Sequence, residues 1–277
     1  MTIDAHQHFW RYDPIRDAWI TDDMAVLRKD YLPPELSPLL VANDMDGCIA
    51  VQADQSEQET HFLLEMADQH PFVKGVVGWV NLQADNIAER LETFRSYRSL
   101  CGFRHIVQAE TDPDFLQRPA FQRGIALLED LGYSYDILVY PHQLPAVHSL
   151  LERFPRQRFV IDHLAKPSVR TGTFEPWATW MTRIARHKQV FCKLSGLVTE
   201  ADWQGWSYDQ FVPYLDHVTR IFGPERLLFG SDWPVCLLAA DYRQVLDVVL
   251  RHMDGWTPSD RDMVMGSVAA HCYHIKD

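Results

Sequence analysis

Phe159-Val160-Ile161-Asp162-His163-Leu164-Ala165-Lys166-Pro167 begins as a short apolar run and ends in charged and polar residues. The apolar part has the length and composition of a buried strand. Aspartate and histidine at the end of such a strand are unusual, because burying unpaired polar groups is costly. A satisfied core histidine beside an ordinary surface lysine is the alternative interpretation. A short apolar run followed by a helical pattern recurs along the chain and indicates repeated strand–helix units.

Eight such runs are predicted to form strands: Met1–Ala5, Gly47–Ala53, Val73–Leu82, Leu100–Val107, Tyr135–Tyr140, Arg158–Asp162, Val190–Leu194 and Arg226–Gly230. Strands that alternate with helices indicate an α/β fold with a parallel sheet. Eight units in a chain of 277 residues are typical of a closed (β/α)8 barrel of the TIM type. An open doubly wound sheet is the alternative, but no Gly-rich phosphate turn follows the first strand. We expect a single domain over residues 1–277.

Several of the predicted helices carry start and stop signals. Ser56 and Glu59 have the spacing of a capping box, and Asp85 precedes another helical pattern as a candidate N-cap. Gly132 and Gly223 follow apolar helical stripes and are candidate helix ends. These signals place helices between the predicted strands, as a barrel requires.

The formal net charge of the chain is −12, and no basic patch is visible. A nucleic-acid-binding protein needs a basic surface, and an anionic membrane surface would repel this chain. We therefore expect a small-molecule substrate, with neither nucleic acid nor membrane as a partner. The sequence leaves the oligomeric state open.

The five cysteines are scattered, and no C-x-x-C pair occurs. Their odd number and their spacing argue against a disulfide framework or a structural zinc site, so we expect buried, reduced thiols. The segment Met1–His6 lacks the basic start and apolar run of a signal peptide. No apolar stretch reaches the length of a transmembrane helix. These features predict a soluble, cytoplasmic protein.

In a barrel of this kind the chemistry lies at the carboxyl ends of the strands, and polar residues there are candidates for the site. His6 and His8 close the first strand, and residues two apart in a strand share a face. His163 follows the sixth strand and Asp232 follows the eighth. Each signal taken alone also has a non-functional explanation: His6 and His8 could be a chance pair of histidines, and Asp232 could be a turn aspartate before Pro234. Their combination is far more specific.

Histidines on the first strand, a histidine on a late strand and an aspartate on the eighth, in this order, resemble the amidohydrolase superfamily. The resemblance is closest to its sugar-lactonase branch, which includes L-fuconolactonase and L-rhamnonolactonase and is related to 2-pyrone-4,6-dicarboxylate lactonase. It runs over nearly the full chain. The segments that carry it are Ile3–Trp10, Gly102–His105, Asp162–Pro167, Lys193–Leu197 and Phe229–Pro234.

The resemblance implies an amidohydrolase-like barrel in which Asp232 takes a proton from the water that attacks a carbonyl. In metal-dependent members, His6, His8, His163 and Asp232 would hold a divalent ion, usually zinc. The fourth strand ends in Arg104 and His105, with no lysine for carbamylation, which argues against a binuclear centre and leaves one ion or none. Arg104 beside the carbonyl could then supply positive charge, so the catalytic candidates are Asp232, His163 and Arg104. Asp162 is expected to orient the ring of His163 from behind.

Polar and aromatic residues at the other strand ends are candidates for contact with substrate, and rim packing is the alternative for each aromatic residue. They are Trp10, Gln52, Trp79, Asn81, His105, Tyr140, His142, Ser195 and Trp233. Aromatic faces suit the C–H faces of a sugar, and few cations are at hand for carboxylates. This balance favours a neutral aldonolactone over an aromatic dicarboxylate.

The predicted function is therefore hydrolysis of a small sugar lactone, such as L-fuconolactone or L-rhamnonolactone, by water activated at Asp232. A 2-pyrone-4,6-dicarboxylate-type lactonase remains an alternative, as does a related zinc-dependent barrel decarboxylase. A sugar-binding barrel without catalytic activity is a further alternative, but such a protein would have no need for Asp232.

Overall fold

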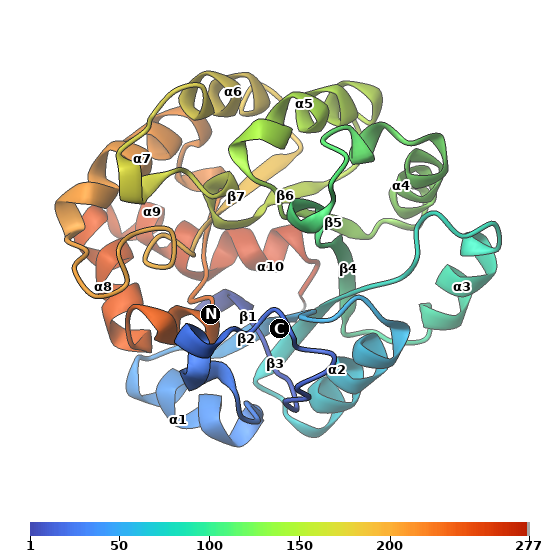
Figure 1. Cartoon of the computed structure of the whole chain (residues 1–277), viewed down its shortest axis with the longest axis horizontal. Coiled ribbons are helices and arrows are strands. Elements are labelled where there is room, and N and C mark those ends of the chain that lie inside the picture. The colour runs from blue at the N-terminus through green and yellow to red at the C-terminus, as the bar shows by residue number, and fades with distance from the viewer. Residues whose placement is uncertain (276–277) are drawn as a thin grey trace.

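The computed structural model describes residues 1–275, which contain one eight-stranded sheet in the order β1 to β8. Each strand pairs in parallel with the next, and the helices form a ring outside the strands (Figure 1). The strands are β1 (Ile3–Gln7), β2 (Gly47–Val51), β3 (Val73–Gly78), β4 (Leu100–His105), β5 (Ser134–Ile137), β6 (Phe159–Ile161), β7 (Val190–Leu194) and β8 (Leu227–Phe229).

The sheet closes on itself through the residues that follow β8. Gln7 of β1 forms a parallel bridge with Trp233. The amide of His8 donates to the carbonyl of Trp233 (2.7 Å), and the amide of Asp232 donates to the carbonyl of His6 (2.8 Å). The predicted (β/α)8 barrel is therefore confirmed. The contacts that close it, between β1 and the residues after β8, involve the candidate site residues His6, His8 and Asp232.

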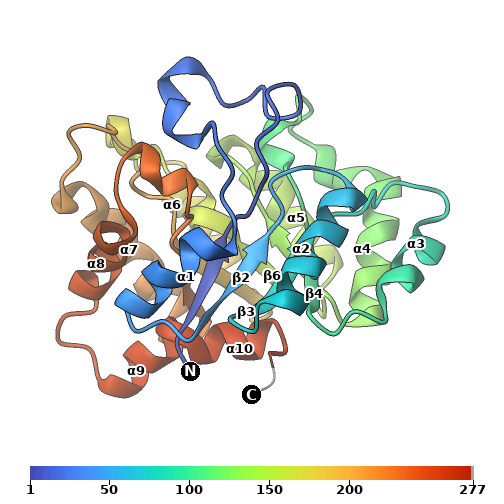
Figure 2. The ribbon, with the colours of Figure 1, turned by 90° about the horizontal axis from the view of Figure 1, so that it is seen from below.

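The helices lie outside the barrel, with α9 and α10 at the end where the N-terminus also lies (Figure 2). They are α1 (Pro33–Ala42), α2 (Glu57–Gln69), α3 (Ile87–Phe94), α4 (Pro119–Leu131), α5 (Leu144–Arg153), α6 (Trp177–Ile184), α7 (Tyr208–Phe222), α8 (Tyr242–His252), α9 (Pro258–Asp262) and α10 (Val268–Cys272). Within residues 1–275, no helix is both long and apolar enough to cross a membrane.

Two apolar layers hold the barrel. The larger lies between the outer faces of the strands and the helices, and it includes Phe103, Tyr135 and Phe159, all almost fully buried. The smaller combines side chains of the strands with residues of the C-terminal segment, among them Val268 and Tyr273. The C-terminal segment therefore closes one end of the barrel with apolar packing, and the opposite end is free for chemistry.

Several predicted strands are longer than the observed ones. The prediction Val73–Leu82 stops at Gly78 in β3, and Tyr135–Tyr140 becomes Ser134–Ile137 in β5. The apolar residues beyond these ends belong to loops that turn over the barrel mouth, where burial continues without strand pairing. In contrast, β1 extends past the predicted end to Gln7, so that His6 lies within the strand. The seventh strand has the predicted bounds.

The predicted start of α2 is confirmed in part. The hydroxyl of Ser56 accepts a hydrogen bond from the amide of Glu59 (3.1 Å), as an N-cap should. The carboxylate of Glu59 does not return to Ser56 but accepts from the amides of Ala53 (2.7 Å) and Asp54 (3.2 Å). The glutamate therefore holds the loop after β2 rather than completing a capping box.

The other helix signals have mixed outcomes. Asp85 was predicted to cap α3, but the N-cap residue is Asn86, and its side chain makes no capping bond. Gly132 ends α4 with a φ of +78°, in the left-handed region that glycine adopts without steric penalty. Gly223 ends α7 as predicted.

A long segment, residues 8–32, connects β1 to α1 and rises above the barrel at the end opposite the N-terminus and α10 (Figure 2). Its ends are tied together, because Trp10 and Tyr31 exchange two backbone hydrogen bonds of 2.9 Å each. Trp19 lies in the raised part and is 45% exposed. The segment thus forms one wall of the barrel mouth.

Candidate active site

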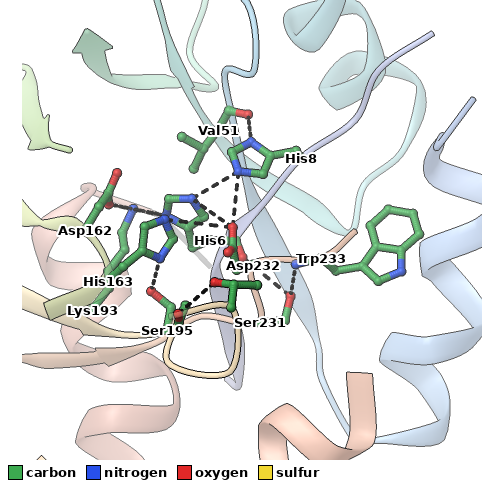
Figure 3. A network of polar contacts seen from close by, with 12 residues as sticks. His6, His8, Val51, Asp162, His163, Lys193, Ser195, Ser231, Asp232 and Trp233 are labelled. Atoms are coloured by element: carbon green, nitrogen blue, oxygen red, sulfur yellow. Dashed lines mark hydrogen bonds and ion pairs between the residues drawn. The ribbon is translucent and has the colours of Figure 1, made fainter. Parts of the chain in front are cut away.

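His6, His8, His163 and Asp232, here called the mouth cluster, converge at the carboxyl ends of β1, β6 and β8 (Figure 3). The Asp232 carboxylate oxygen Oδ1 lies 3.5 Å from Nε2 of His8 and 3.8 Å from Nε2 of both His6 and His163. All four residues are at most 4% exposed. The chain thus brings three imidazoles and one carboxylate to a single point.

The ring orientations leave nitrogen lone pairs facing that point. Nδ1 of His8 lies 2.7 Å from the carbonyl of Val51, so this nitrogen carries the proton and Nε2 is free to accept. Nδ1 of His163 lies 2.8 Å from the hydroxyl of Ser195. Nε2 of His6 lies 3.2 Å from Nε2 of His8. Outer contacts of this kind orient histidines toward a shared ligand.

The donor set fits a divalent metal ion. Ligand atoms of His6, His8 and Asp232 all lie within 4.8 Å of one another. Nitrogen and carboxylate donors are the set that zinc takes in catalytic sites, where a fourth or fifth position stays open for water. A second combination joins His6 and His163 to Asp162, but that carboxylate already contacts two cations.

Buried contacts fix the backbone that carries these ligands. The carboxylate of Asp4 accepts from the amide of His6 (3.1 Å), the amide of Ser231 (2.9 Å) and the hydroxyl of Tyr242 (3.1 Å). Burial raises the pKa of Asp4 to about 6. Asp232, the next residue after Ser231, has a φ of +58°, a conformation that costs roughly 1–3 kcal/mol for a side chain of this type. Asp4 therefore joins β1 to the strained turn that presents Asp232.

The electrostatic state of the mouth cluster suits catalysis at neutral pH. Burial raises the pKa of Asp232, but the nearby imidazoles of His163, His8 and His6 outweigh burial and hold the pKa below its usual range. Burial lowers the pKa of His163 to about 4 and, with the charge of Lys193, lowers the pKa of His6 as well. The aspartate is therefore ionised while these two histidines are neutral.

A second group of charges, Asp136, Asp162 and Lys193, adjoins the mouth cluster and is called the sealed cluster. All three side chains are fully buried. The ammonium of Lys193 lies 2.5 Å from Asp136, 3.0 Å from Asp162 and 3.1 Å from Nδ1 of His6. Burial lowers the pKa of Lys193, but both aspartates more than offset it, so the pKa is raised.

The expected partner of Asp162 is corrected by these contacts. We expected Asp162 to orient His163, but its carboxylate lies 3.3 Å from Nδ1 of His6 and 2.9 Å from the guanidinium of Arg104. The hydroxyl of Ser195, and not Asp162, contacts Nδ1 of His163 and orients its ring. Asp162 follows β6 directly and lies in the barrel interior, where Arg104 and Lys193 reach it, while the positive φ of His163 (52°) breaks the strand alternation between the two neighbours.

A cavity of about 330 Å3 opens onto the mouth cluster. Its walls combine aromatic rings, amides and two long cationic side chains. The lining residues are His8, Trp10, Trp19, Ala53, Gln55, Arg104, Ile106, Gln108, Ala109, Leu138, His163, Lys166, Asp232 and Val235. A small polar ligand therefore fits directly against His8, His163 and Asp232.

Among the predicted substrate-contact residues, Trp10 lines this cavity and the others do not. Gln52 is fully buried and donates to the carbonyl of Arg104 (3.1 Å). Trp79 donates through its indole N–H to His105 (3.2 Å), so these two satisfy each other. Ser195 is engaged with His163, as described above.

The structure also places the remaining predicted contacts outside the lining of the cavity. Asn81 is exposed, and its amide oxygen accepts from the backbone of Gln83 within a turn. His142 is exposed, and its ring stacks on Tyr140 with centroids 6.3 Å apart. Trp233 is 2% exposed, and Figure 3 shows its ring pointing away from the histidines. These aromatic side chains therefore pack around the site instead of lining it.

Trp19, Gln55 and Gln108 line the cavity but were missed. Gln55 and Gln108 each lie a few residues beyond the end of a strand, so polar residues further along the mouth loops were the available signal. The amide oxygen of Gln108 is buried and has no hydrogen-bond partner among residues 1–275. Trp19 lies in the long segment after β1, where no periodic pattern places a side chain.

Comparisons with known proteins agree with this architecture. The family model described as "Amidohydrolase" matches residues 3–275. An L-fucono-1,5-lactonase from Burkholderia multivorans is 41% identical to the chain, over 100% of this chain and 97% of its own length. An L-fucono-1,5-lactonase from Burkholderia ambifaria is 36% identical, over 99% and 95%. The crystal structure of an amidohydrolase from Burkholderia multivorans with bound zinc has a TM-score of 0.96 at 41% identity and covers 100% of both chains.

Proposed function

The chain belongs to the amidohydrolase family, and on that premise we propose that it is a lactonase that hydrolyses the ester bond of a small sugar lactone. The observation that carries the proposal is the opening of the mouth cluster into a cavity of sugar size, in a chain 41% identical to an L-fucono-1,5-lactonase. A six-membered aldonolactone such as L-fucono-1,5-lactone is the proposed substrate.

Asp232 is proposed as the base that activates water. It is the carboxylate at the cavity floor, and its low pKa keeps it ionised, and so free of a proton, at neutral pH. Water beside Asp232 attacks the carbonyl carbon, and the proton passes to the ring oxygen as the ring C–O bond breaks. One water is consumed and one hydroxy acid is formed.

The mouth cluster is also proposed as the site of one divalent ion, with zinc the best match to its donors. His6, His8, His163 and Asp232 would hold the ion through three Nε2 atoms and one carboxylate oxygen. When bound, it would lower the pKa of water and polarise the carbonyl. Arg104 adds fixed positive charge at the same place, since its guanidinium lies 3.3 Å from Nε2 of His6.

The cavity wall favours a neutral polyhydroxy substrate. Trp10 and Trp19 offer aromatic faces to the C–H groups of a sugar, with their ring centroids 6.3 Å apart. The unpartnered amide oxygen of Gln108 can accept a hydrogen bond from a sugar hydroxyl. A dicarboxylate would need more than one free cation, but Arg104 is already paired with Asp162, and Lys166 is the other lysine or arginine that lines the cavity.

A screen of sugar lactones tests the proposal. Acid release is followed with a pH indicator for L-fucono-1,5-lactone, L-rhamnonolactone and their epimers, with and without a chelator. We expect one or more 1,5-aldonolactones to be opened faster than 2-pyrone-4,6-dicarboxylate, and chelation to lower the rate. Release of CO2 from an aromatic acid, with no acid release from any lactone, would contradict the proposal and favour a decarboxylase.

A further inference from the structure

His163, Leu164, Ala165 and Lys166 form an unusual left-handed turn at the edge of the cavity. Their φ angles are 52°, 53°, 55° and 49°. Each residue with a side chain is sterically disfavoured in this region, so such a run persists only where its surroundings hold it. The indole of Trp177 donates to the carbonyl of Leu164 (2.7 Å), and the amide of Lys166 donates to the carbonyl of His163 (2.7 Å).

This turn brings both of its polar side chains to the cavity. His163 and Lys166 line the cavity, while Leu164 and Ala165 are fully buried in the apolar layer. Gly196 permits the arrangement, because a Cβ at that position would lie 2.6 Å from Nδ1 of His163. The sequence thus maintains a disfavoured backbone where it delivers one ligand of the mouth cluster and one lysine.

The ammonium of Lys166 has donors to spare. Its Nζ lies 3.1 Å from the carboxylate of Glu200 and 5.6 Å from the centre of the Tyr140 ring. Among residues 1–275, Glu200 is the one carboxylate within 4.0 Å of this nitrogen. An ammonium carries three N–H groups, so donors remain for a ligand in the cavity.

Lys166 also stays charged where it lies. Burial lowers the pKa of Lys166, but the carboxylates of Glu200 and Asp232 more than offset burial and raise the pKa above its ordinary value. Lys166 and Asp232 both line the cavity, so the lysine and the proposed base face the same small space. A substrate bound at Asp232 therefore meets a full positive charge on the Lys166 side.

Arg104, the other long cation of the cavity, differs in this respect. It is 3% exposed, and its guanidinium contacts Asp162, Nε2 of His6 and the carbonyl of Gln52. Both of its terminal nitrogens are thus engaged by groups of the protein. Lys166 is also paired with one carboxylate, but it keeps N–H groups for a ligand at the cavity wall, so it is the better placed of the two to follow a charge that develops on a ligand.

We propose that Lys166 is a catalytic residue of the lactonase reaction proposed above, whose ammonium donates to the ester oxygens of the bound lactone and stabilises the negative charge that develops on them. The proposal rests on that function. Water forms the new C–O bond, the ring C–O bond breaks with its electron pair on the ring oxygen, and the proton carried by Asp232 ends there. Lys166 keeps its own protons throughout.

Lys166→Met tests this role with the 1,5-aldonolactone that the screen finds to be turned over fastest. We expect kcat to fall by about 10²–10³-fold, the range for losing one donor to a developing oxyanion, with a much smaller change in KM and an unchanged Tm. Glu200→Gln is the matched control, because it removes the ion pair and keeps the lysine. If Lys166 served only to anchor Glu200, both variants would lose activity equally.

Chemical rescue guards against a folding defect. Lys166→Cys is treated with 2-bromoethylamine, which converts the thiol into an aminoethyl analogue of lysine, and kcat is measured before and after on the same protein. The five native cysteines are buried, so modification is directed to the new thiol, and treated wild-type protein is the control. We expect kcat of the alkylated Lys166→Cys protein to be at least about 10-fold higher than kcat of the same protein before alkylation.

Three results would overturn the role of Lys166: a wild-type kcat in Lys166→Met, an equal loss in Glu200→Gln, or no recovery on alkylation. A wild-type protein that opens no lactone would instead refute the proposed function, and the role of Lys166 with it. The two failures are thus told apart by the activity of the wild type.

Discussion

The mouth cluster and the sealed cluster meet at His6, yet their charges are balanced in opposite ways. In the sealed cluster, Lys193 lies within 3.0 Å of both Asp136 and Asp162, and all three are fully buried. In the mouth cluster, Asp232 faces three imidazoles at 3.5–3.8 Å and borders the cavity. Paired charges of the first kind hold a structure together, and convergent groups with free lone pairs are available to a ligand.

The contrast shows why burial of polar residues is not by itself a sign of function. Tyr273 of the C-terminal segment donates to Asp136 (2.7 Å), so the sealed cluster is tied to the closed end of the barrel. Its ion pairs join residues of the protein to one another, and none of its three residues lines the cavity. The mouth cluster is equally buried, but its Nε2 atoms and its carboxylate are directed at one another across a space that a metal ion or water fits.

The largest expected effect is on catalysis at the mouth. Asp232→Asn keeps the shape of the side chain and removes the base, so we expect kcat for the lactone to fall by roughly 10²–10⁴-fold. Tm should stay close to that of the wild type. Stopped-flow measurement of acid release and thermal unfolding check the two halves of this prediction. A wild-type kcat would show that the base lies elsewhere.

Breaking the sealed cluster should affect stability first. Lys193→Met leaves two aspartates buried without their shared cation, and we expect the free energy of unfolding to fall by about 3–5 kcal/mol. Urea denaturation measures the loss. Lys188→Met, at an exposed site, is the matched control and should change stability by less than about 0.5 kcal/mol. Equal stability of the two variants would mean that the sealed cluster contributes nothing net.

Glu59 is a smaller, intermediate case, a buried carboxylate with no lysine or arginine nitrogen within 4.0 Å among residues 1–275. Burial raises its pKa from 4.5 to about 7. Because the folded state binds the proton more tightly, its stabilising contribution is complete below pH 4.5 and is lost as the pH rises through 7. Removing the ionisable group removes this loss.

We therefore expect wild-type protein to lose stability relative to Glu59→Gln by on the order of 2 kcal/mol between pH 5 and pH 8. Urea denaturation of both proteins at the two pH values measures the difference, and the comparison cancels the titration of all other groups. A constant difference between the proteins would show that Glu59 is ionised throughout. The opposite sign would mean that its two backbone contacts outweigh burial.

Much of this architecture can be predicted from the sequence, because it follows from local periodicity. Alternation along β1 places His6 and His8 together, and the order of strands in a closed barrel brings His163 and Asp232 to them. The partner of Asp162 could not be predicted in this way. It depends on which side chains cross the barrel interior, and Arg104 and Lys193 reach it from strands that are distant in sequence.

The walls of the cavity were harder still to predict. Trp19 and Gln108 lie on loops whose paths are set by tertiary packing and not by a repeating pattern. Trp79 and Trp233 sit near strand ends, where an aromatic residue fits packing and ligand contact equally well, and in both cases packing prevails. The left-handed turn that presents Lys166 contains no glycine, so the sequence carries no signal for its positive φ angles.

A crystal structure of Asp232→Asn grown with the unhydrolysed lactone tests the central claim most directly, since this variant should bind the substrate without opening it. We expect the lactone in the cavity, with its carbonyl carbon facing residue 232 and its ester oxygens toward the mouth cluster and Lys166. A lactone bound elsewhere on the chain, or held in the cavity with its ester group turned away from the histidines, would contradict it.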